Sequence, residues 1–319
     1  MTVKSVKMQF VEITMNGMLN DILEKCATYK ERGKVASYIP ELAKVDKNEF
    51  GICVATDDGE LFCSGDANNF FTMQSVVKPL ILLLALMDNG MEAVRKLVGV
   101  EATGKPFDTF NYSDQALNAE HINPMVNAGA ITLCTLIKGD TYDEKFQRLL
   151  ELVRKVASNP NLVVDERVYQ SEKITGNKNR ALAYMLKAYR LVSDDVEDML
   201  DCYFKACSIK ITAVDLARIA LVFSKGGVEP DSKERLFDKR YARYINAILM
   251  TCGMYDGSGE FALNVGIPAK SGVGGGIMAV VPGRMGIGIY SPSLDAKGNS
   301  IAGIKALELL SQQLDLSIF

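Results

Sequence analysis

The sequence contains a single histidine, His121, and no tryptophan among its 319 residues. A Ser-His-Asp or Cys-His hydrolase would have to use this one histidine, which lies in a loop-like stretch before Asn123-Pro124. A loop histidine is more often solvated than catalytic, and a metal site with several histidines is excluded. If the chain is a hydrolase, lysine and tyrosine are the bases to look for.

Cysteines are few and unpatterned. The seven cysteines are scattered, odd in number and contain no C-x-x-C pair. This distribution favours reduced thiols in a cytoplasmic protein over a disulfide framework or a zinc site.

The chain has neither a large net charge nor a long hydrophobic segment. The 36 basic and 39 acidic residues give a net charge of −3, so nothing recommends nucleic acid as a partner. The longest apolar run, residues 79–87, is about half as long as a membrane span, and the N-terminus lacks the features of a signal peptide. We therefore expect a soluble intracellular protein with no nucleic-acid and no membrane partner.

Strand and helix patterns alternate along the chain in blocks. Helical spacing to about residue 35, with Gly33 as its stop, is followed by a predicted hairpin of strands 50–56 and 60–64. The chain then reads as helical to about residue 250. Three short strands and a helix complete it, at 269–273, 276–281, 285–290 and 301–314.

This order predicts an α+β fold. One antiparallel sheet would be built from both chain ends and flanked by helices, with an all-helical subdomain between them. We expect residues 1–319 to form a single catalytic unit. Residues 1–74 and 225–319 would make the sheet-containing lobe, residues 75–224 the helical lobe, and the active site would lie in the cleft between them.

The stretch from Phe70 to Leu84 joins a polar segment to an apolar run, with Ser75 and Lys78 at the junction. If the run is a helix, the two side chains share a face at its start, three residues apart. A serine hydroxyl needs a base within hydrogen-bond reach to attack a carbonyl, and a partly neutral lysine can be that base. The alternative is a serine N-cap followed by a surface lysine, which is typical of a random S-x-x-K.

Two stretches in the helical region, 123–131 and 169–180, are unusually polar. Asn127 and its small neighbours are either a helix N-cap or an amide offered to a carboxylate. Glu172 is either a solvated helix-terminal residue or a carboxylate that faces a cavity and suits a cationic amine.

Two C-terminal stretches are rich in glycine. Tyr255, among three glycines, is either a turn side chain or a phenol held at a cleft. The strand that enters Lys270-Ser271-Gly272 and a glycine run would expose backbone N–H groups that could stabilise an oxyanion.

An S-x-x-K and a later Lys-Ser-Gly strand match the layout of the serine β-lactamase and penicillin-binding superfamily. The S-D-N element is not obvious, because Ser113-Asp114-Gln115 is only a near match. Longer motifs closely resemble the serine-dependent glutaminases of the compact bacterial type, from about residue 35 to the C-terminus. They are Tyr38–Lys44, Gln74–Leu80, Asn123–Ala130, Tyr169–Glu172, Cys252–Asp256 and Pro268–Val273.

The resemblance implies a β-lactamase-like fold and hydrolysis of L-glutamine to L-glutamate and ammonia through a γ-glutamyl-serine ester. Ser75 would be the nucleophile and Lys78 its base, and Tyr255 would assist proton transfer to the ammonia. The N–H groups of Ser75 and Val273 would form the oxyanion hole, with Lys270 in a supporting role.

The resemblance also implies which residues bind the substrate. With Ser75, Tyr255 and Val273, they are Tyr38, Asn127, Glu172, Asn179 and Tyr203. Glu172 would hold the α-ammonium, and the amides and phenols would hold the α-carboxylate. The stretch 103–108 would be a lid. No cofactor and no metal are expected, and the protein would be a homodimer or homotetramer.

Two other classes of function fit the same residues. A β-lactamase or esterase could use the Ser75/Lys78 pair and would tolerate loss of Glu172. A protein that senses glutamine without turnover could keep the pocket, although the presence of Ser75, Lys78, Tyr255 and Lys270 together argues against it.

Overall fold

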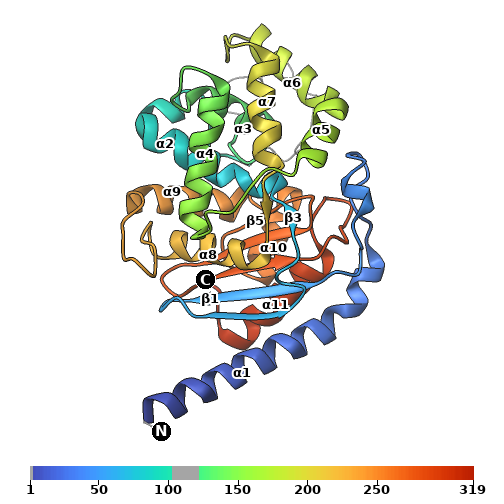
Figure 1. Ribbon diagram of the computed structural model, residues 1–319, viewed down its shortest axis with the longest axis vertical. Helices are drawn as coiled ribbons and strands as arrows, with labels where there is room; N and C mark the ends of the chain where they lie inside the picture. The colour runs from blue at the N-terminus through green and yellow to red at the C-terminus, as the bar shows by residue number, and fades with distance from the viewer. Residues whose placement is uncertain (1–2, 103–121) are drawn as a thin grey trace.

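The computed structural model describes residues 3–102 and 122–319, with side chains from residue 14 onward. A five-stranded antiparallel sheet has the order β2-β1-β7-β6-β5, and it lies below a group of helices in Figure 1. Its strands are β1 (Gly51–Thr56), β2 (Leu61–Gly65), β5 (Ala269–Ser271), β6 (Gly276–Val281) and β7 (Met285–Tyr290). The predicted α+β architecture, with one sheet built from both chain ends, is confirmed.

Helices cover both faces of the sheet. On one face, α1 (Val3–Cys26) and α11 (Ile301–Leu314) enclose a core with the alternate side chains of β1, β6 and β7. On the other face lies α8 (Ala213–Ser224). This arrangement buries both sides of the strands, as their continuous apolar sequences require.

The remaining helices form the helical part between the two halves of the sheet. Thr141 and Glu144 form a capping box at the start of one of them, and Thr212 and Asp215 form another at the start of α8. The helices are α2 (Lys78–Arg95), α3 (Asn127–Leu136), α4 (Tyr142–Ala157), α5 (Glu166–Thr175), α6 (Asn177–Ala188), α7 (Val196–Cys207), α9 (Lys239–Cys252) and α10 (Ser258–Asn264). No helix in the described ranges is both long and apolar enough to cross a membrane.

Helix α8 packs on the sheet, although the division of the chain into lobes made from the sequence placed it in the helical lobe. That division ends the helical lobe at residue 224, yet α8 packs directly on β7. The reason is a pair of strand glycines: a Cβ on Gly288 would lie 1.9 Å from the Ala213 carbonyl oxygen, and one on Gly286 would lie 2.2 Å from the Ala217 carbonyl oxygen. The missing side chains let the helix backbone rest on the strand.

The expectation of reduced thiols is wrong at one pair. Cys53 in β1 and Cys63 in β2 are directly opposite each other in the hairpin register and form a disulfide. They are 10 positions apart in the sequence, so no C-x-x-C spacing marks the pair; strand pairing brings them together. The other five cysteines are free and buried.

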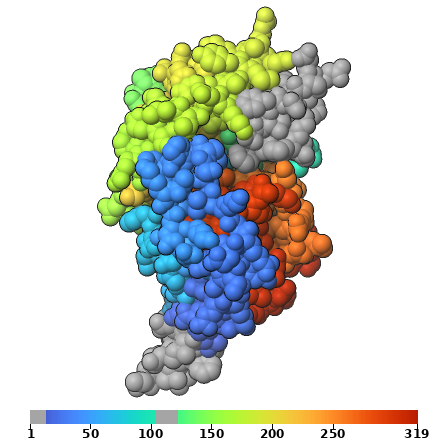
Figure 2. All heavy atoms as spheres, turned by 90° about the vertical axis from the view of Figure 1, so that its right-hand side faces the viewer, coloured from blue at the N-terminus to red at the C-terminus, as the bar shows by residue number. Residues whose placement is uncertain are grey.

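The structure also contains short elements that were not predicted from the sequence. Strand β3 (Phe71–Thr72) pairs with β4 (Lys210–Ile211) in a two-stranded sheet and is followed along the chain by the 3₁₀ turn η3 (Gln74–Val77). Further 3₁₀ turns are η1 (Ala27–Arg32), η2 (Leu42–Lys44) and η5 (Tyr255–Gly257). In Figure 2 the N-terminal segment, in blue, lies against the C-terminal segment, in red, beneath the helical part.

Candidate active site

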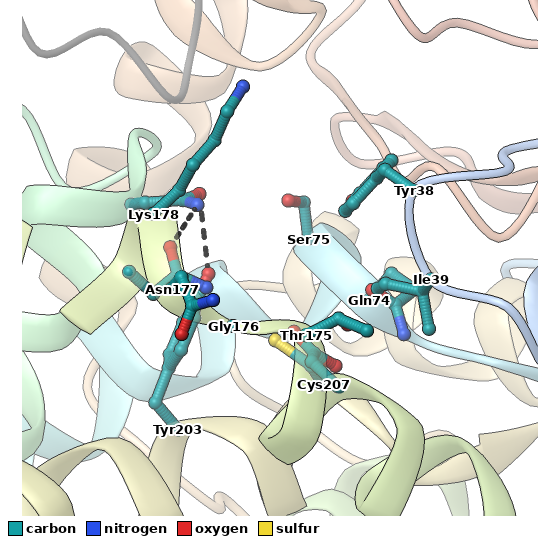
Figure 3. Close-up of a pocket in the computed structure, with 13 residues that line it drawn as sticks. Tyr38, Ile39, Gln74, Ser75, Thr175, Gly176, Asn177, Lys178, Tyr203 and Cys207 are labelled. Carbon is teal, nitrogen blue, oxygen red and sulfur yellow. Dashed lines mark hydrogen bonds between the residues drawn. The ribbon is translucent and has the colours of Figure 1, made fainter. Parts of the chain in front are cut away.

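Residues of the N-terminal segment and of the helical part line a common pocket of about 290 Å³. Five of the predicted substrate-binding residues line it in addition to Ser75. Figure 3 shows Ser75 between Lys178 and Tyr38, with its hydroxyl oxygen directed away from Tyr38. The lining consists of Tyr38, Ile39, Gln74, Ser75, Asn127, Glu172, Thr175, Gly176, Asn177, Lys178, Asn179, Tyr203 and Cys207.

Ser75 lies in the 3₁₀ turn η3, which runs directly into α2 at Lys78, with Pro79 in the first turn of that helix. The preceding residue, Gln74, has a φ of 47°. A left-handed conformation costs a non-glycine residue about 1 kcal/mol or more and persists where the surroundings enforce it. The turn therefore presents Ser75 at the pocket while burying its neighbours.

Lys78 is fully buried, which rules out the surface-lysine alternative. Its Nζ donates to Oδ1 of Asn127 at 2.7 Å and to the Met125 carbonyl at 3.3 Å. The same Oδ1 accepts a hydrogen bond from the Tyr203 hydroxyl at 3.3 Å, and Asn127 Nδ2 donates to Oδ1 of Asn179 at 2.9 Å. One hydrogen-bonded chain thus joins the lysine beside the serine to three pocket residues.

Tyr255, in the 3₁₀ turn η5, lies beside Ser75. Burial raises the pKa of the Tyr255 phenol, although the nearby Ser75 side chain and Val273 backbone act in the lowering direction. The phenol therefore keeps its proton at neutral pH and lies beside both the nucleophile and the predicted oxyanion donor.

Lys270 lies behind Tyr255 and is also fully buried. Its Nζ donates to the carbonyls of Gly253 at 3.0 Å and Ser271 at 2.7 Å, and it is 4.3 Å from the centroid of the Tyr255 ring. Burial, and then the charge of Lys78, lower the pKa of Lys270. Two buried amines in one site favour a neutral form of at least one of them.

The glycine run after β5 lets this strand approach η3. A Cβ on Gly272 would lie 2.8 Å from the Met73 carbonyl oxygen, and one on Gly274 would lie 2.6 Å from the Thr72 carbonyl oxygen. Only glycine permits such a close approach of two backbones. The run therefore places Val273 next to the serine turn.

Glu172, on the short helix α5, is only 5% exposed. This burial rules out the alternative in which it is a solvated residue at the end of a helix. Burial raises its pKa to about 8, against the opposing effects of a hydrogen bond with the Gln74 side chain and of the positive charge of Lys78. Its Oε2 has no hydrogen-bond partner within the described ranges. A buried carboxylate oxygen without a partner calls for a cationic ligand.

Sequence reasoning missed several lining residues. Gln74 is next to Ser75 in the motif that was recognised, but a glutamine beside a nucleophile carries no pattern of its own. Cys207 lies one helical turn after Tyr203 on α7, so the i, i+4 spacing could have suggested that it faces the same cavity.

Three sequence-based assignments lie outside the described residues: the lid at 103–108, the near match at Ser113-Asp114-Gln115, and His121. Across the part of the chain with described side chains, no group of three or more His, Cys, Asp or Glu side chains could hold a metal ion.

A family model described as glutaminase matches residues 33–319. The glutaminase of Clostridium tetani (strain Massachusetts / E88) is 50% identical over 305 residues, covering 96% of this chain and all of that protein. The glutaminase of Clostridioides difficile (strain 630) is 49% identical over 302 residues, covering 95% and 98%.

Solved structures agree. The probable glutaminase ybaS has a TM-score of 0.91 at 34% identity, covering 96% of this chain and 98% of that one. A probable glutaminase from Bacillus subtilis complexed with 6-diazo-5-oxo-L-norleucine has a TM-score of 0.86 at 38% identity, covering 94% of each chain. The predicted β-lactamase-like fold is confirmed, and the chain belongs to the glutaminase family.

Proposed function

We propose that this member of the glutaminase family hydrolyses L-glutamine to L-glutamate and ammonia through a γ-glutamyl ester on Ser75. The observation that carries the proposal is that Ser75 and the partnerless carboxylate oxygen of Glu172 belong to one pocket. The pocket thus offers a nucleophile at one position and an ammonium site at another, as an amino acid with a reactive side chain requires. A Bacillus subtilis glutaminase of the same fold forms a covalent complex with 5-oxo-L-norleucine on reaction with 6-diazo-5-oxo-L-norleucine.

Lys78 takes the proton of Ser75 as the hydroxyl attacks the γ-carbonyl carbon. Its backbone lies in the turn that follows Ser75, and its hydrogen bonds to Asn127 and Met125 hold the amine at that position. The N–H groups of Ser75 and Val273 stabilise the oxyanion. Tyr255 then delivers a proton to the departing ammonia, and water hydrolyses the ester by the same groups in reverse.

The α-ammonium of glutamine binds Glu172, while Tyr38, Asn127, Asn179 and Tyr203 contact the amino-acid end of the substrate. Tyr38 is 56% exposed and lies at the open side of the pocket. Unpaired polar groups discriminate strongly against ligands that lack their partners. The site therefore favours a free α-amino acid over simple amides, esters and β-lactams.

The two lobes act as one catalytic unit, with the serine turn where they meet. The proposal includes a cytoplasmic location. Five of the seven cysteines are free, as is usual there, whereas the Cys53–Cys63 disulfide is of a kind that is rare in that compartment. Assembly as a homodimer or homotetramer is supported by the family resemblance, and analytical ultracentrifugation tests it: a monomer at micromolar concentration contradicts it.

The test of the function is ammonia release from L-glutamine by the wild type and by Ser75→Ala. The wild type should turn over millimolar glutamine, and the alanine variant should lose the activity while keeping its fold by circular dichroism. An inactive wild type, or an alanine variant that keeps its rate, overturns the proposal.

A further inference from the structure

A second hollow adjoins the active site, and Glu172 is not among the residues that line it. This groove of about 540 Å³ is lined by segments 32–38 and 294–298 and by Val273, and we call it the basic groove. Tyr38 lines both the groove and the glutamine pocket. Because Val273 also packs against Tyr255, the groove begins at the proposed oxyanion and proton-transfer groups.

The walls of the groove are fixed to each other. Lys34 N donates to the Leu294 carbonyl at 3.0 Å and Leu294 N donates to the Lys34 carbonyl at 2.9 Å. A Cβ on Gly33 would lie 2.6 Å from the Leu294 carbonyl oxygen, so the two segments are as close as glycine allows. In Figure 2 the N-terminal and C-terminal segments of the chain meet on one face. A preformed groove of this kind needs little reorganisation to bind a ligand.

Its charge is mainly positive. Arg32, Lys34 and Lys297 line the groove, against one lining acid, Asp295. Lys297 also forms an ion pair at 3.5 Å with Glu260, which does not line the groove. Asp295 already accepts the backbone N–H groups of Lys297 at 2.8 Å and Asn299 at 2.9 Å through Oδ1. Within the described part of the chain, neither Arg32 nor Lys34 forms an ion pair; Arg32 stacks 4.4 Å from the Tyr29 ring centroid.

Position and charge together define what would bind. In the proposed acyl transfer the γ-carbonyl oxygen lies on Val273 and the amino-acid end lies in the glutamine pocket, so a substituent on the γ-nitrogen is directed out of that pocket, toward the groove. In glutamine the γ-nitrogen carries only hydrogen and leaves the groove unused. A substituent with a carboxylate would reach its cations.

We propose that the basic groove binds a carboxylate-bearing leaving group, so that this enzyme also hydrolyses γ-glutamyl amino acids to glutamate and the free amino acid. The inference rests on Ser75 as the proposed nucleophile. The Ser75 Oγ–carbon bond forms as the γ-carbon–nitrogen bond breaks, and the proton lost by Ser75 is balanced by the one that the amino group gains. Water then hydrolyses the ester.

The test compares γ-L-glutamylglycine with γ-L-glutamylglycinamide, which has the same size but no carboxylate, by measuring glutamate release. The wild type should cleave the glycine compound with a kcat/KM about three- to tenfold higher, the range expected for exposed charge pairs. The preference should shrink with added salt. The double variant Lys34→Gln/Lys297→Gln should bring the ratio close to one while its kcat/KM for glutamine stays within about twofold of wild type.

Lys47→Gln is the matched control, since Lys47 is an exposed lysine outside the groove, and it should keep the wild-type ratio. If glutamine is hydrolysed but γ-glutamylglycine is not, the groove proposal is wrong and the glutaminase proposal stands. Equal rates for the two γ-glutamyl compounds would overturn the role of the cations. If Ser75→Ala retains glutamine hydrolysis, the failure lies in the proposed function itself.

Discussion

The Nζ atom of Lys78 lies 2.7 Å from Oδ1 of Asn127. Oδ1 also accepts from the Tyr203 hydroxyl, so the amide oxygen faces the lysine and the amide nitrogen faces Asn179. A neutral oxygen holds the amine in place without adding the negative charge that would stabilise its protonated form. The choice of asparagine over aspartate at this position is therefore part of how Lys78 can act as a base.

Asn127→Asp should impair the enzyme most at low pH. A carboxylate next to Lys78 favours the ammonium, so the acid limb of the kcat profile should move to higher pH by about one unit or more. At neutral pH, kcat should fall about tenfold for each unit of that shift.

Asn127→Ser is the control for this prediction. It also loses the amide donor to Asn179 and should raise KM, but it adds no charge, so its acid limb should stay where the wild-type limb is. Superimposable kcat profiles for the aspartate variant and the wild type would contradict the role assigned to Lys78.

The affinity for glutamine should depend on pH through Glu172. Burial raises the pKa of this carboxyl group to about 8 in the empty pocket, whereas an ammonium ligand favours its ionised form. Below pH 8, binding must expel a proton, which costs about 1.4 kcal/mol per pH unit. KM should therefore rise up to tenfold for each unit as the pH falls from 8, until the pH reaches the lower pKa of the occupied site.

Calorimetry in buffers of different ionisation enthalpy should detect release of close to one proton on glutamine binding at pH 7. Glu172→Gln should remove this proton release and raise KM at least about 100-fold, as expected when a charged partner is lost in a buried site. An unchanged kcat/KM in this variant would exclude Glu172 as the ammonium ligand.

Tyr255→Phe should lower kcat with little change in KM. It keeps the ring above Lys270 but removes the hydroxyl that lies beside Ser75. Loss of one acid–base group typically costs 10²- to 10⁴-fold. Hydrolysis of a γ-glutamyl ester should suffer less than hydrolysis of glutamine, since an alkoxide leaves with less need of a proton than an amine. An equal loss on both substrates would contradict proton delivery by Tyr255.

The Lys270→Met variant tests whether Lys270 only stabilises the structure around the site or also contributes to catalysis. The variant keeps the volume but removes the Nζ donor to the carbonyls of Gly253 and Ser271. The Gly253 carbonyl still accepts from the Ser271 N–H at 3.1 Å. We expect a loss of thermal stability and a lower kcat, and both effects should be smaller in Lys270→Arg. If the methionine variant keeps the kcat of the wild type, Lys270 has a structural role only.

Particular residues show what could be predicted from the sequence. The strands were predicted from short apolar runs separated by turn signals, which depend only on residues close together in the sequence. Ser75, Lys78 and Glu172 were identified through motifs, and their burial supports that choice. The Cys53–Cys63 bond, the placement of α8 and the basic groove depend on which segments meet in space, which periodicity along one segment does not specify. Gln74 was missed for the same reason: its φ of 47° and its contact with Glu172 exist only in the folded turn.

The close contact between α8 and β7 gives a prediction about stability. Gly288→Ala would place a methyl group 1.9 Å from the Ala213 carbonyl oxygen, and backbone cannot move aside as a side chain can. The helix or the strand must shift, so unfolding in urea should show a loss of about 1–3 kcal/mol or more. Gly17→Ala in α1 is the matched control, because nothing lies within 4 Å of its Cβ position. There the same substitution should stabilise the protein by about 0.5–1 kcal/mol, since alanine favours a helix. Equal free energies of unfolding for the two variants would mean that α8 does not rest on the β7 glycines.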